Sequence, residues 1–179
     1  IRRNINLGKD EDLTDNKPLR WKTMARVALG QSKMVTRPIA GFFHIIVYAG
    51  FILINIEVLE IVIDGVFGTH RALSFLGSVY NVAIGFFEVL AVLVIIACIV
   101  FLTRRYISKL ARFWSPEMKG WPTKDATYIL VIEIVLMVAL LFMNATDQVL
   151  QGMGNEHYKA AGSFPVSSQL APMFANFSE

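Results

Sequence analysis

One histidine, His44, lies inside a long apolar stretch of the chain, the run from Ile39 to Ile63. A histidine within hydrocarbon is costly, so it usually faces a protein interior, a water-filled cavity or a cofactor. On a helix, one stripe along the same face contains Arg37, Gly41, His44, Tyr48, Phe51 and Asn55. Histidine is a common axial ligand of haem iron. Gly41 leaves room for a flat macrocycle, and Arg37 could pair with haem propionates, so the stripe suits a b-type haem with His44 as metal ligand.

The same pattern also fits a hydrogen-bonded structural histidine, and the sequence leaves both interpretations open. A second axial ligand is not evident. His70 and His157 lie outside the apolar stretches, on the side away from His44. Met137 is conceivable as a ligand, although a methionine in a span is more often a packing residue.

Carboxylates form a second group of candidate chemical residues. Glu57 and Glu60 are one turn apart and share a face opposite the His44 stripe, while Glu88 and Glu133 lie in two further apolar stretches. A carboxylate within a membrane must be paired, protonated or reached by water. Glu57, Glu88 and Glu133 could therefore form a proton path or a quinone headgroup site. The alternative is that they make interhelical hydrogen bonds.

Three apolar blocks must position these side chains. Residues 39–63, 79–103 and 127–150 are each long enough to cross a hydrocarbon core of roughly 30 Å as a helix. Because a backbone in lipid must satisfy its own hydrogen bonds, the blocks are expected to be helices. The sequence predicts an all-α membrane protein whose three transmembrane helices belong to a larger helical bundle.

The distribution of basic residues predicts the orientation of these helices. Residues 1–38 contain nine Lys and Arg and residues 104–126 contain six, whereas residues 64–78 and 151–179 contain one each. Cytoplasmic segments carry the excess of Lys and Arg, so the N-terminus is predicted to be cytoplasmic. This topology accounts for the net charge of +3 without nucleic-acid binding.

The remaining segments are expected to be peripheral. Residues 1–38 are interpreted as a cytoplasmic linker followed by an interfacial amphipathic helix over Trp21–Val35, although a helix packed on another domain fits equally well. Residues 151–179 are expected to be an extracytoplasmic tail. The single cysteine, Cys98, excludes disulfides and a cysteine-ligated cluster within this chain. The first residue is isoleucine, so we expect a piece of a longer protein.

The run RPIAGFFHIIVYAGFILINIEVLEIVIDGVFGTHR (residues 37–71) resembles a known family, as do WKTMARVALGQSKM before it and LLFMNATDQVLQ and EHYKAAGSFPVS after it. These are the membrane-anchored iron–sulfur oxidoreductases of Bacteroidetes type, related to the D-type polypeptide of heterodisulfide reductase. Their membrane part is similar to the haem b bundle of the nitrate reductase gamma subunit. The resemblance implies His44 as a haem b ligand, and it implies iron–sulfur clusters in parts of the protein outside this chain.

The function expected from the resemblance is electron transfer between cytoplasmic iron–sulfur clusters and membrane quinone through b-type haem, as part of a quinone-linked oxidoreductase. Expected partners are the lipid bilayer, menaquinone or another quinone, and a soluble carrier such as electron-transfer flavoprotein. The expected location is the bacterial inner membrane. The alternative is a non-redox transmembrane scaffold or a small transporter subunit of a larger complex.

Overall fold

The computed structural model of the protein describes residues 15–116, 120–154 and 157–175. These residues form helices and irregular segments without a strand, and three of the helices are long and apolar enough to cross a membrane. This confirms the predicted all-α membrane fold with three spans. The chain divides into two compact units, residues 1–41 and residues 42–179.

The first unit contains helix α2, Lys17–Met24, which continues into a π-helical turn over Ala25–Leu29. The helical run therefore begins and ends earlier than the predicted Trp21–Val35. It stops where the amide of Gly30 donates to the carbonyl of Ala25 at 2.9 Å. The placement of this helix on the membrane surface stays a prediction.

Gly41 has a local structural role in the first unit. A Cβ on this residue would lie 2.7 Å from the carbonyl oxygen of Met34 and 3.0 Å from the Cα of Val35. Only glycine therefore allows the turn before α3 to approach the helix this closely. The predicted role of Gly41 beside a haem stays a prediction.

The three long helices are α3 (Pro38–Phe67), α4 (Ser78–Tyr106) and α5 (Trp121–Gly152), and α3 begins in the first unit. Each extends past the apolar block predicted for it, because helical hydrogen bonding continues into the polar residues at its ends. α5 begins six residues before the predicted Thr127. Pro122 lies in its first turn, where a missing amide hydrogen has no intrahelical partner to lose.

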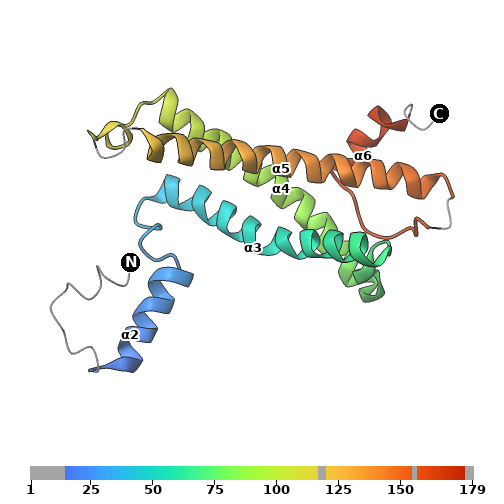
Figure 1. The fold of residues 1–179 in the computed structure, drawn as a ribbon, viewed down its shortest axis with the longest axis horizontal. Helices are drawn as coiled ribbons and strands as arrows, with labels where there is room; N and C mark the ends of the chain where they lie inside the picture. Colours follow the sequence, from blue (N-terminus) through green and yellow to red (C-terminus); the bar gives the residue numbers. More distant parts are fainter. Residues whose placement is uncertain (1–14, 117–119, 155–156, 176–179) are drawn as a thin grey trace. The chain divides into compact units, whose positions relative to one another are not determined.

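Helix α4 supplies most of the core of the second unit, and it runs opposite to α3 and α5 (Figure 1). Gly50 of α3 lies against α4, where an added Cβ would lie 2.4 Å from a methyl group of Val94. The glycine thus lets the two helices approach. We call the end of this bundle where α4 ends and α5 begins the basic end, and the opposite end the far end.

The segment after α5 turns back along the helices. It carries the short helix α6, Ser167–Leu170, and the Ser167 hydroxyl donates to the carbonyl of Leu141 at 2.9 Å. Leu141 lies eleven residues before Gly152, the last residue of α5, which corresponds to about 16 Å along the helix. This segment therefore contacts α5 well before the helix ends at Gly152. Its predicted extracytoplasmic location stays a prediction.

Candidate functional site

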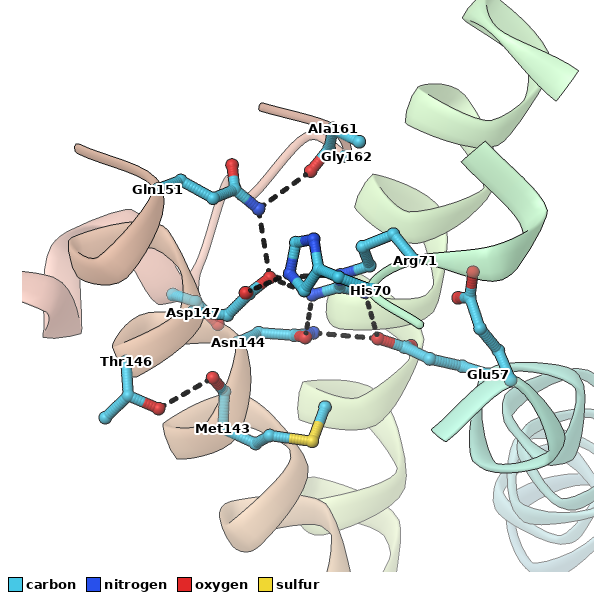
Figure 2. A network of polar contacts seen from close by, with 12 residues as sticks. Glu57, His70, Arg71, Met143, Asn144, Thr146, Asp147, Gln151, Ala161 and Gly162 are labelled. Atoms are coloured by element: carbon cyan, nitrogen blue, oxygen red, sulfur yellow. Dashed lines mark hydrogen bonds and ion pairs between the residues drawn. The ribbon is translucent and has the colours of Figure 1, made fainter. Parts of the chain in front are cut away.

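Arg71, in the connection between α3 and α4, is the centre of a buried polar network at the far end of the bundle (Figure 2). Its Nε and Nη2 atoms both donate to Oδ2 of Asp147, at 3.0 and 2.8 Å. Nη2 also donates to the Asn144 side-chain oxygen at 2.8 Å, and Nη1 lies 3.5 Å from a carboxylate oxygen of Glu57. One guanidinium thereby connects α3 and α5.

The electrostatics of Arg71 are dominated by these neighbours. Burial alone lowers the pKa of the guanidinium, but the interactions with Tyr80 and Asp147 outweigh burial and raise the pKa above its ordinary value. Phe164 adds a cation–π contact, with its ring centroid 5.2 Å from the guanidinium carbon. Arg71 therefore remains a cation in the folded protein.

Asp64 shapes the backbone that presents Arg71. Its carboxylate accepts the amides of Arg71 and Ala72, at 2.8 and 3.1 Å, and the hydroxyl of Thr69 at 2.6 Å. Arg71 itself adopts a left-handed conformation with φ of 54°. Such a conformation is unfavourable for a residue with a Cβ, so the bonds to Asp64 hold the turn in place.

Glu60 ties the same connection to the start of α4. Its carboxylate accepts the amide of Leu73 and the hydroxyl of Tyr80, both at 2.8 Å. Tyr80 in turn accepts a longer hydrogen bond from Arg71, at 3.3 Å. The acidic face predicted on α3 is thus the framework on which the connection folds.

The hydrogen bonds of His70 determine its tautomer. The amide of Lys159 donates to Nδ1 at 3.2 Å, so Nδ1 accepts and carries no proton. Nε2 then bears the hydrogen and donates to Oδ1 of Asp147 at 2.6 Å. Asp147 thereby receives His70 on one oxygen and Arg71 on the other.

The predicted carboxylates fall into three different settings. Glu57 is 1% exposed, and one of its oxygens accepts the side-chain amide of Asn144 at 3.0 Å. Glu88 is fully buried, and its Oε2 accepts the amides of Val166 and Ser167 at 2.9 and 3.1 Å. The second oxygen of each carboxylate is buried without a hydrogen-bond partner in the described part of the chain.

Glu133 instead lines a cavity of about 440 Å³ between α3 and α5. It is half-buried, and the side chains around it are mostly apolar. Asn55 lies on the α3 wall and donates its amide to the carbonyl of Phe51. The structure therefore separates Glu133 from the Arg71 network, although Asn144 and Asp147 of that network lie on about the same face of α5 as Glu133 in the sequence pattern.

The proposed haem residues are less constrained. His44 is half-buried in α3, and its ring makes no hydrogen bond or ion pair within the described ranges. Its neighbour Phe43 packs edge-on against Phe101 of α4, with 6.4 Å between ring centroids. Arg37 and Gly41 belong to the first unit, where Arg37 is exposed. Met137, the conceivable second ligand, is buried in the core.

The sequence pattern does not reveal the importance of Arg71. In the sequence it is a single charge in a short connection, and nothing in its immediate neighbourhood marks it as buried. The available signal is the unpaired acidity of Glu57 and Asp147, which requires a positive partner within reach.

The fold and its buried network define a multi-pass helical membrane protein. Within the described residues, no group of three or more His, Cys, Asp and Glu side chains is arranged to hold a metal ion. No protein-family profile matches the chain, and no solved structure matches it.

The chain is similar to the probable iron-sulfur-binding oxidoreductase FadF of Bacillus subtilis (strain 168). The two are 28% identical over 171 residues, which is 96% of this chain and 22% of the relative. The similarity supports a relationship to iron–sulfur oxidoreductases. The chain spans about a fifth of that relative.

Proposed function

We propose that this chain is the membrane part of an iron–sulfur oxidoreductase that passes electrons between iron–sulfur clusters and membrane quinone through b-type haem. The clusters would be ligated by other parts of the full protein, because this chain has a single cysteine. The similarity to FadF along nearly the whole chain is the observation that carries the proposal. The proposal includes a finer relationship, to the D type of heterodisulfide reductase, with a membrane part like the nitrate reductase gamma subunit.

His44 is the axial ligand in this proposal. Its half-buried ring is free of protein hydrogen bonds in the described ranges, so either ring nitrogen is available to a metal. A structural histidine in a span would be expected to have a polar partner. Bound haem would supply one-electron chemistry within the bilayer. Gly41, three residues before His44 in α3, and Arg37, which directly precedes α3, are the other residues proposed to bind it.

Glu133 and Glu57 have different roles in this proposal. Glu133 lines a cavity whose volume falls within the usual range for small-molecule sites, and the apolar lining suits an isoprenoid quinone. Glu57 belongs to a buried network in which it meets Arg71 and Asn144, and it is the candidate for a step in a proton path. Glu88 instead holds the tail, through two backbone amides.

The reduced-minus-oxidised visible spectrum of the full-length protein tests the proposal. We expect a b-type signal that is lost in His44→Ala and retained in His157→Ala, a substitution at an exposed residue. Absence of haem from the intact protein would refute the proposal. For the carboxylates, Glu133→Gln is expected to slow quinol-coupled turnover without changing haem content.

A non-redox scaffold is the second candidate, and the Arg71 network favours it. This network links α3, α4 and α5 through side chains alone, which is what a helix-organising protein requires. The two candidates differ in the spectrum just described, since a scaffold has no visible chromophore.

A further inference from the structure

Arg105, in the last turn of α4 at the basic end, is buried without an acidic partner in the described residues. Arg105 is only 6% exposed, and its Nε and Nη2 atoms have no hydrogen-bond partner among the described residues. A buried charge left unpaired is strongly unfavourable, so a group outside the described protein atoms is expected to meet these two donors.

The contacts that Arg105 does make leave this need unmet. The ring of Phe113 lies 5.5 Å from the guanidinium carbon and contacts it as a cation–π partner. Such a contact uses the charge but supplies no oxygen to the N–H groups. The C-terminal end of α4 is also favourable for a cation, yet that effect likewise satisfies no donor.

The surrounding charge favours an anion. Residues 104–126 contain six Lys and Arg against two acidic residues. A guanidinium presents parallel donors that match two oxygens of a carboxylate or phosphate. The excess positive charge in this segment would draw such a group to the basic end.

The position of Arg105 relates it to His44. Phe101 lies four residues before Arg105, on the same face of α4, and its ring packs against that of Phe43. Since α3 and α4 run in opposite directions, Arg105, four residues past Phe101, and His44, one residue past Phe43, lie on opposite sides of this ring contact along the helix axes. His44 and Arg105 are therefore about 7.5 Å apart along the helix axis.

We propose that Arg105 binds an anionic oxygen group, a carboxylate or a phosphate, at the basic end of the bundle. Two sources offer this chemistry: a propionate of a haem held by His44, and the phosphate of an anionic phospholipid. The first source rests on the proposed function, whereas the second does not.

The test compares Arg105→Gln with the neighbouring Arg104→Gln in the full-length protein, reconstituted in nanodiscs of phosphatidylcholine with or without phosphatidylglycerol. Two quantities are measured: the rate of haem transfer to apomyoglobin, and the phosphatidylglycerol retained in native mass spectrometry. Loss of a charge-assisted hydrogen-bond pair is expected to change one of them about tenfold in Arg105→Gln and neither in Arg104→Gln.

Faster haem loss identifies the propionate, and reduced phosphatidylglycerol identifies the lipid phosphate. If the protein holds no haem, the proposed function fails and the lipid measurement alone decides this inference. Arg105→Lys keeps the charge but loses the parallel N–H donors of the guanidinium, so the affected measurement should be intermediate between those of the wild type and Arg105→Gln. If Arg105→Gln does not fold, Arg105→Lys replaces it. Values for Arg105→Gln or Arg105→Lys equal to those for Arg104→Gln in both measurements would overturn the proposal.

Discussion

Arg71 and Asp147, 76 positions apart in the chain, are joined by two hydrogen bonds from the guanidinium to a single carboxylate oxygen, at 2.8 and 3.0 Å. The other oxygen of Asp147 accepts His70. Asp147 of α5 thus binds two consecutive residues of the connection after α3, and this holds the end of α3 against α5.

Breaking this pair from one side is expected to destabilise the protein substantially. Arg71→Ala leaves Asp147 and Glu57 buried without their cation, a change that costs about 3–5 kcal/mol in comparable buried pairs. The free energy of unfolding in mixed micelles measures the effect. Lys124→Ala, at an exposed position of α5, is the matched control and should change it by less than about 0.5 kcal/mol. Equal stability of the two variants would show that the pair does not hold the bundle.

The approach of α3 to α4 is expected to depend on Gly50. In Gly50→Ala the new methyl group would meet Val94, so the helices must separate, at a cost of about 1–3 kcal/mol. Adding Val94→Ala removes the opposing methyl groups and should restore part of the loss. The unfolding free energies of both variants check this.

Gly65→Ala is the control for Gly50→Ala, because nothing lies within 4 Å of a Cβ at that position in the described structure. Alanine is the better helix former, so this variant should be neutral or slightly stabilising. A similar loss at both glycines would point to a general intolerance of substitution in α3 rather than to the contact with Val94.

The hydrogen bonds from the tail to Glu88 are expected to slow amide hydrogen exchange in the tail. Glu88→Ala removes the acceptor of the Val166 and Ser167 amides. Exchange of these two amides should accelerate about tenfold. Glu133→Ala, in the wall of the cavity between α3 and α5, should leave them unchanged. Unchanged protection in Glu88→Ala would mean that other contacts, such as that of Ser167 with Leu141, suffice to dock the tail.

The helices were predictable from the sequence because a membrane imposes a single strong requirement. The apolar blocks from Ile39 and from Val79 begin within a residue of the observed α3 and α4. The ends were less predictable, since helical hydrogen bonding passes from lipid into the polar interface and hydropathy does not mark where it stops. α5 shows this most clearly, beginning at Trp121 with Pro122 in its first turn.

The far-end network was only half predictable. Helical spacing placed Glu57 and Glu60 on one face, and the cost of burying them required partners. The identity of those partners depends on contacts between distant segments, as between Glu57 and Asn144. The two amides bound by Glu88 carry no sequence signature at all, because any residue except proline supplies one.

Electron transfer through haem, between membrane quinone and the iron–sulfur clusters, is the central claim, and anaerobic rapid mixing tests it most directly. The oxidised full-length protein is mixed with a reduced menaquinone analogue while the α band of the haem and the cluster absorbance are followed together. We predict that the haem band of the wild type is reduced, and that His44→Ala loses both this band and quinol-driven reduction of the clusters. Reduction of the clusters in His44→Ala at the wild-type rate would contradict the account.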